Sequence, residues 1–145
     1  MIGKLTYEET DDVLRANIWG RIGSNDGDKT YIVPVSYVYD GKYIFAHSLE
    51  GIKIEMMRKN PKVCFEVDEM KSINNWKSVI VWGEYQELTT ERDRYYAMGL
   101  FTERMIQLKT ARANVLHPHT PHGENMRPVF YRIVIMHRTG RFENE

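Results

Sequence analysis

A run of strand and turn signals between residues 29 and 69 constrains the fold of this chain most strongly. Apolar side chains fall on both faces of Lys29–Tyr39, which predicts a strand covered on both sides by core or by a partner. Asp40-Gly41 follows, and an Asp-Gly pair between two strand patterns is a strong signal for a two-residue hairpin turn. We therefore expect Lys29–Tyr39 and Lys42–His47 to be antiparallel neighbours.

A short helix and another strand follow the hairpin. The helix is expected over Leu49–Lys59, because Asn60-Pro61 ends it, and the strand over Pro61–Asp68. Pro34 has no N–H for a strand ladder, so it predicts an edge, a bulge or a break that leaves backbone groups free for a ligand. The other expected elements are helices over Thr6–Asn17 and Thr90–Lys109, strands over Asn17–Ser24, Trp76–Leu88 (bent near Gly83) and Val129–His137, and a polar loop over Met70–Asn75.

Composition excludes several classes of protein. The 145 residues suffice for one core, so a single domain over residues 1–145 is expected. Twenty basic and twenty acidic residues give no net charge, which argues against a nucleic-acid partner. No stretch approaches the roughly 18 apolar residues of a membrane span, and the N-terminus lacks a signal-peptide pattern. Cys64 is the one cysteine, so no internal disulfide can form. We expect a cytoplasmic protein without a membrane partner.

The expected elements indicate a mainly β fold. About six strands and three helices are expected, and every neighbouring pair that the sequence connects is antiparallel. Several short strands with one Asp-Gly hairpin are typical of a small barrel with helices packed outside it.

The junction between the second strand of the hairpin and the short helix is a candidate phosphate site. A helix N-terminus offers unpaired N–H groups, Gly51 permits close approach, Ser48 adds a hydroxyl and Lys53 adds a positive charge. His47 precedes them and can hydrogen-bond a ligand or donate a proton near pH 7. The alternative is that Ser48 merely caps the helix, Lys53 is a solvated surface lysine and His47 is satisfied by backbone.

Two further features are open to a functional interpretation. Trp82 projects from the same face of its strand as Ser78 and can flank a flat ring, although a strand tryptophan more often packs in a core. His117, His119 and His122 lie within six positions, so a zinc site is conceivable. No His-Glu-x-x-His pattern accompanies them, and we predict no metal site.

The motifs together resemble a known family. Their order is Val33-Pro-Val-Ser36, the Asp-Gly turn, Ala46-His-Ser-x-x-Gly-x-Lys53, Asn60-Pro61, Cys64-Phe65-Glu66-Val67 and Trp76-Lys-Ser-Val-Ile-Val-Trp-Gly83. This order resembles the pyridoxamine 5′-phosphate oxidase-like, FMN-binding split-barrel superfamily, and within it the nitroimidazole-resistance (Nim-type) proteins.

The resemblance implies a six-stranded antiparallel split β-barrel that forms a homodimer, with FMN in a groove at the interface. It places His47 beside the flavin and ligand as the candidate catalytic residue. The other implied cofactor-binding residues are Pro34, Val35 and Ser36 along the isoalloxazine ring, Ser48, Gly51, Ile52 and Lys53 around the phosphate, and Ser78 and Trp82 facing the flavin region from the other subunit.

The resemblance also implies an activity. We expect an oxidoreductase that uses NAD(P)H to reduce a small acceptor, such as a nitroaromatic or a quinone. The vitamin-B6 oxidases carry an arginine near Tyr31, a lysine near Ser36 and Ser-Arg-Lys at Gly51-Ile52-Lys53, so these departures argue against pyridoxamine 5′-phosphate oxidation here. The alternatives are a non-catalytic flavin or haem binding protein, and a B6-vitamer or deazaflavin enzyme on the same barrel.

Overall fold

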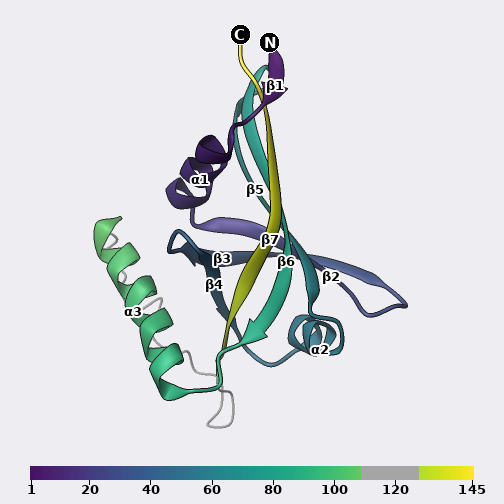
Figure 1. Cartoon of the computed structure of the whole chain (residues 1–145), viewed down its shortest axis with the longest axis vertical. Helices are drawn as coiled ribbons and strands as arrows, with labels where there is room; N and C mark the ends of the chain where they lie inside the picture. Colours follow the sequence, from purple (N-terminus) through teal and green to yellow (C-terminus); the bar gives the residue numbers. More distant parts are fainter. Residues whose placement is uncertain (109–127) are drawn as a thin grey trace.

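The computed structural model describes residues 1–108 and 128–145. These residues form seven strands and three helices (Figure 1). In chain order the elements are β1 (Ile2–Lys4), α1 (Tyr7–Ala16), β2 (Trp19–Asn25), β3 (Thr30–Tyr39), β4 (Tyr43–Ser48), α2 (Ile52–Lys59), β5 (Lys62–Ser72), β6 (Asn75–Glu87), α3 (Glu91–Gln107) and β7 (Val129–Glu143).

Six of the strands close into an antiparallel barrel. The order is β7-β4-β3-β2-β5-β6, and pairing between β6 and β7 completes the ring. The expected six-stranded antiparallel barrel is therefore confirmed. The seventh strand, β1, lies outside the ring and pairs with the far end of β7. Its three residues are too few to show an alternating pattern, so this strand was not predicted from the sequence.

Alternating side chains fill the interior of the barrel. Val63, Phe65 and Val67 of β5 point inward, as their period-two spacing predicts, and each is at most 5% exposed. The ring of Tyr37 meets Phe65 edge to face at 5.0 Å, and its hydroxyl donates a hydrogen bond to the Leu14 carbonyl of α1. Full burial of a large apolar side chain contributes about 1.5–3 kcal/mol. The hydrogen bond from Tyr37 to Leu14 joins β3 to α1 and fixes this helix against the barrel.

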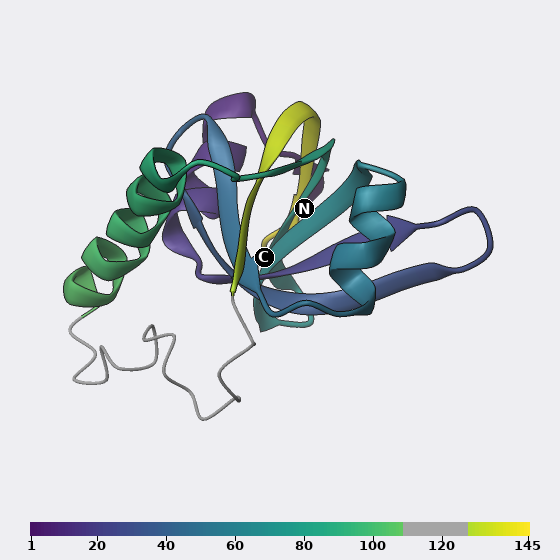
Figure 2. The same ribbon diagram turned by 90° about the horizontal axis from the view of Figure 1, so that it is seen from below.

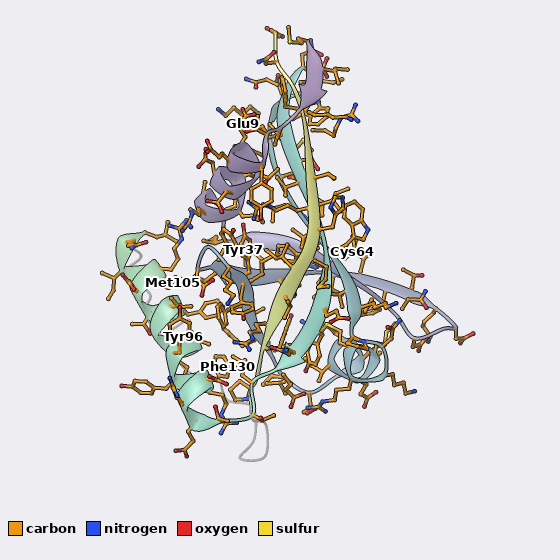
Figure 3. The ribbon with its side chains drawn as sticks, viewed as in Figure 1. Glu9, Tyr37, Cys64, Tyr96, Met105 and Phe130 are labelled. Carbon is orange, nitrogen blue, oxygen red and sulfur yellow. The ribbon has the colours of Figure 1, made fainter. Side chains whose placement is uncertain are left out.

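Helix α3 covers part of the outer surface of the barrel. Figure 2 shows α3 and α2 on opposite sides of it. A second apolar cluster lies between α3 and the sheet, and Tyr96 of α3 packs edge to face on Phe45 at 5.6 Å (Figure 3). The buried members of this cluster are Val38, Phe45, Leu88, Ala97, Phe101 and Phe130. No helix within residues 1–108 or 128–145 is long and apolar enough to cross a membrane.

Three local expectations need correction. The hairpin joins β3 to β4 as expected, but its loop residues are Gly41 and Lys42, because Asp40 still pairs with Tyr43. Gly41 has a φ of 98°, which explains the glycine. The expected loop over Met70–Asn75 is mostly strand, and β7 continues to Glu143 instead of ending at His137. The end of β5 and the start of β6 are exposed, whereas the buried positions in the extension of β7 are Arg138 and Gly140, which show no apolar alternation in the sequence.

The expected bend in the long strand is present. The register between β6 and β7 shifts between Trp82 and Gly83. A side chain at position 83 would collide with the carbonyl of Val134, so this bulge requires glycine.

Candidate functional site

The β4–α2 junction leaves the first turn of α2 without a side-chain cap. The N-cap residue is Gly51, which has no side chain that could accept a hydrogen bond from the first turn. Ser48 is still in β4, where it pairs with Val129 of β7, so the interpretation of Ser48 as a simple helix cap is wrong. The backbone N–H groups at this end of α2 therefore remain available to an anion.

Lys53 lies on that first turn and is half-buried. No ion pair in the described part of the chain includes it. Burial lowers the pKa of its ammonium group below the ordinary value. The interpretation of Lys53 as a solvated surface lysine is therefore wrong. A half-buried cation without a carboxylate gains stability from a bound anion.

His47 lies beside this lysine, at the end of β4. Its ring packs against Phe101 of α3 at 4.9 Å and against Phe130 of β7 at 5.3 Å between centroids. Desolvation by these neighbours, and then the charge of Lys53, lowers the pKa of His47 below 6.5. Within the described residues the imidazole has no hydrogen bond, so the alternative of a backbone-satisfied histidine is not what the structure shows. A neutral imidazole at pH 7 can orient a ligand by hydrogen bonding.

Strand β3 presents an open edge near the expected ring site. It pairs with β2 from Thr30 to Ser36, but with β4 only from Tyr37 to Tyr39. Pro34 therefore lies where one edge of β3 has no strand partner among the described residues, as its missing N–H predicted. Val35 points into the core, so only its backbone can face a ligand, whereas Pro34 is exposed and Ser36 half-buried.

Ser78 and Trp82 lie on the outer face of β6, while Val79 and Val81 fill the core. Trp82 is 43% exposed and stacks on His137, with 5.4 Å between ring centroids and 26° between planes. The alternative of a core tryptophan is therefore wrong. No hydrogen bond, ion pair or ring contact among the described residues joins Ser78 or Trp82 to His47 or Lys53. One chain therefore does not assemble all the expected residues into one site.

A polar cluster beside Ser78 includes Arg21, which no sequence pattern indicated. Ser78 Oγ lies 3.2 Å from Glu66 Oε2, and a guanidinium nitrogen of Arg21 lies 3.4 Å from Glu66 and 3.2 Å from Asp68. Burial and then the neighbouring Asp68 raise the pKa of Glu66 above its ordinary value. The sequence showed alternating acidic residues on β5, but only the pairing of β2 with β5 brings Arg21 to them.

The structure describes Cys64 but not the histidine cluster. Cys64 is half-buried, and desolvation raises the pKa of its thiol, so it is not an activated nucleophile. His117, His119 and His122 lie outside the described residues. Residues 1–108 and 128–145 contain no group of three or more potential metal ligands.

Comparisons with known proteins bear on this geometry. The family described as pyridoxamine 5′-phosphate oxidase matches residues 6–142. The chain is 36% identical to an uncharacterized protein of Rhizobium meliloti over 104 residues, which is 69% of each protein.

Solved structures share the fold. An FAD-binding protein from Mesorhizobium loti is 30% identical, with a TM-score of 0.77 and coverage of 99% of each chain. A protein from Bacteroides thetaiotaomicron assigned to 5-nitroimidazole antibiotic resistance has a TM-score of 0.72 at 14% identity, over 98% of this chain and 87% of that one. At that identity the second likeness bears on the fold alone.

Proposed function

This chain belongs to the pyridoxamine 5′-phosphate oxidase family, and from that premise we propose that it is a flavin-binding oxidoreductase with FMN as its cofactor. The observation that carries the proposal is Lys53, a half-buried cation with no carboxylate partner in residues 1–108 and 128–145, at the uncapped start of a helix. The FAD-binding relative from Mesorhizobium loti supports a flavin in particular.

The chain has suitable groups for a phosphate tail. A phosphomonoester carries nearly two negative charges at neutral pH, and its burial requires a cation and N–H donors. Lys53 supplies the cation, and the first turn of α2 supplies the donors. Gly51 has no side chain to obstruct the approach of the phosphate oxygens, and Ile52 extends outward from the same turn. Ser48 adds a hydroxyl at the end of β4.

The open edge of β3 is suited to a flat ring with carbonyl and N–H groups. Backbone groups from Pro34 to Ser36 lack a β4 partner and can bond such a ring edge on. A flavin bound there would accept a hydride from NAD(P)H and would pass electrons to a small acceptor, such as a nitroaromatic or a quinone. His47, neutral at pH 7, would orient the acceptor or the ring by a hydrogen bond, and it becomes a better base once an anionic phosphate lies beside it.

A second copy of the chain would complete the site. The outer face over β2, β3 and β6 exposes Trp19 by 57%, Ile32 by 69% and Trp82 by 43%. Such a face on a chain without net charge favours association with its own copy. In that homodimer Ser78 and Trp82 would meet the ring bound by the partner, which explains why one chain does not bring them to His47.

The experiment that tests this function is the visible spectrum and mass of the ligand that copurifies with the protein. We expect FMN at high occupancy, and we expect Lys53→Ala to lose it. Lys59→Ala is the matched control, because Lys59 is an exposed lysine in the last turn of the same helix. Retention of flavin by Lys53→Ala at wild-type occupancy would refute the phosphate site.

A second measurement addresses turnover. NAD(P)H should bleach the bound flavin, and a nitroaromatic or quinone acceptor should restore its colour. A flavin that stays oxidised under NADH and NADPH would indicate a binding protein without this activity.

A further inference from the structure

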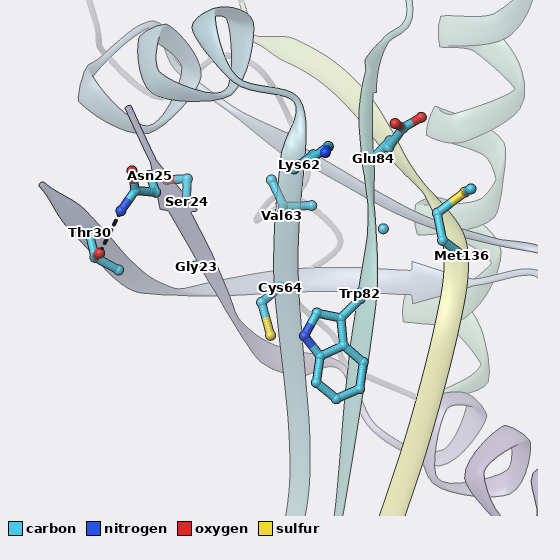
Figure 4. Close-up of a pocket in the computed structure, with 11 residues that line it drawn as sticks. Gly23, Ser24, Asn25, Thr30, Lys62, Val63, Cys64, Trp82, Glu84 and Met136 are labelled. Atoms are coloured by element: carbon cyan, nitrogen blue, oxygen red, sulfur yellow. Dashed lines mark hydrogen bonds between the residues drawn. The ribbon is translucent and has the colours of Figure 1, made fainter. Parts of the chain in front are cut away.

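Helix α2 lies between two regions that the proposed flavin site uses. Its first turn carries Lys53 of the phosphate site. Just after its last turn, the side-chain amide of Asn60 donates a 2.8 Å hydrogen bond to the carbonyl of Asn25. Asn25 lines a groove of about 520 Å³ that Trp82 also lines (Figure 4). In the proposed homodimer Trp82 meets the ring bound by the partner, so this groove is part of the flavin site. The contacts that hold α2 in place therefore matter for flavin binding.

A double ion pair connects the last turn of α2 to the loop before its first turn. One edge of the Arg58 guanidinium, Nη1 and Nη2, donates to both carboxylate oxygens of Glu50 at 3.0 and 2.7 Å. Its other edge, Nε and Nη2, donates to both oxygens of Glu87 on β6 at 2.7 and 3.1 Å. Each carboxylate therefore has the paired, charge-assisted geometry in which a guanidinium binds most strongly.

Glu87 anchors this arrangement to the barrel. The hydroxyl of Tyr85, a residue that is 8% exposed, donates a 2.7 Å hydrogen bond to Glu87 Oε1, which also accepts from Arg58 Nε. The hydrogen bond from Arg58 lowers the pKa of Glu87 below its ordinary value, so this carboxylate is charged at neutral pH. Strand β6 thus holds the guanidinium, and the guanidinium in turn holds Glu50, which lies in the exposed loop after β4.

Glu50 is a carboxylate next to the proposed phosphate site. It directly precedes the N-cap residue Gly51, and a carboxylate near a helix N-terminus is attracted to the unpaired N–H groups and to the positive end of the helix dipole. It would also be a natural partner for Lys53. In the described part of the chain the first turn has no side-chain cap and Lys53 has no ion pair, while both oxygens of Glu50 are bonded to Arg58.

We propose that Arg58 is a positioning residue for flavin binding, which holds Glu50 away from the first turn of α2 and so keeps that turn open to the FMN phosphate. This inference rests on the proposed function, because it concerns the same phosphate site. Without Arg58, the Glu50 carboxylate would occupy the first turn as an internal competitor. The phosphate would then bind only the fraction of molecules in which the first turn is open.

The test compares FMN with riboflavin, which lacks only the phosphate. Equilibrium dialysis of the full-length chain against each compound gives the two dissociation constants. Arg58→Gln should weaken FMN about fivefold to tenfold and leave riboflavin unchanged, because the competitor acts on the phosphate alone. Adding Glu50→Gln to Arg58→Gln should restore most of the FMN affinity, since the competing charge is then absent. Arg92→Gln, at an exposed arginine of α3, is the matched control and should change neither constant.

A merely structural role of Arg58 predicts a different pattern. The side chains of Arg58 and Glu50 are 42% and 55% exposed, so loss of their ion pair should change the free energy of unfolding little. If Arg58 only stabilised α2, FMN and riboflavin would weaken together in Arg58→Gln. Glu50→Gln would then fail to restore FMN binding.

Two outcomes would overturn the inference. They are FMN binding of wild-type strength in Arg58→Gln, and a double variant that binds FMN as weakly as Arg58→Gln alone. Lys53→Ala separates this inference from the proposed function. Loss of FMN in Lys53→Ala with full retention in Arg58→Gln would keep the phosphate site and reject the role of Arg58. Retention of FMN in Lys53→Ala would reject the phosphate site, and the role of Arg58 with it.

Discussion

The outer surface of the barrel has two regions that differ in what covers them. Over β3, β4 and the start of β7, α3 buries Phe45 and Phe130 and desolvates His47. Over β2, β5 and β6 no described element lies outside the sheet, and Trp19 and Trp82 are exposed. The first region is mostly apolar, whereas the second combines exposed tryptophans with the polar cluster of Arg21, Glu66 and Asp68. The difference shows that α3 covers one apolar part of the outer surface from within the chain, while the described residues leave Trp19 and Trp82 exposed on the other.

The first prediction concerns the covered region and has the largest effect. Phe101→Ala should lower the free energy of unfolding by about 3–5 kcal/mol, because it removes a ring that is 3% exposed between α3 and the sheet. Urea denaturation monitored by circular dichroism gives this value. Tyr95→Ala, on the exposed side of α3, should change it by about 0.5 kcal/mol or less. Equal losses in the two variants would mean that α3 is not anchored through this cluster.

The second prediction concerns the uncovered region. Trp19→Asp should leave the fold of each chain intact but weaken self-association by about thirtyfold or more, which corresponds to 2 kcal/mol for an interface hot spot. Sedimentation velocity over a dilution series measures the effect. Ile73→Asp is the control, because Ile73 is 88% exposed at the tip of the β5–β6 hairpin. A dimer that Trp19→Asp does not weaken must use another surface.

The third prediction concerns the pH dependence of His47 and has the smallest effect. Its pKa is lowered in the folded, flavin-free protein, so the unfolded chain binds the proton more tightly. Stability should therefore be full above about pH 6.5 and fall as the pH drops below it. We expect a loss of about 1 kcal/mol or less between pH 7 and pH 5 that His47→Gln removes. His137→Gln, on the exposed stack, is the control. If stability depends on pH in the same way in His47→Gln as in the wild type, groups other than His47 cause the loss.

Local signals made the barrel predictable from the sequence. Three of these signals act over only a few residues: the turn at Asp40-Gly41, the helix end at Asn60-Pro61 and the alternation on β5. The structure confirms all three, with the turn shifted by one residue. Strand β1 and the end of β7 depend on pairing between segments that are distant in the sequence, so no local pattern marked them.

The candidate site was predictable in part. The alternation along β6 correctly separated Ser78 and Trp82 from Val79 and Val81. It could not tell whether the outer face is covered, because that depends on where α3 docks. The contact of Arg21 with Glu66 spans 45 residues of sequence and follows from strand register alone. The roles of the flavin-site residues remain predictions.

The open edge of β3 has a consequence for solubility. Unpaired N–H and C=O groups along a strand invite extended segments of other molecules to add to the sheet and start aggregation. Pro34 lies in the middle of that edge and contributes no donor, so a foreign strand cannot form a continuous ladder there. A short planar molecule needs fewer bonds than a strand. The open edge of β3 therefore favours short binding partners over long ones. It can admit a small planar ligand while it resists the addition of a foreign strand.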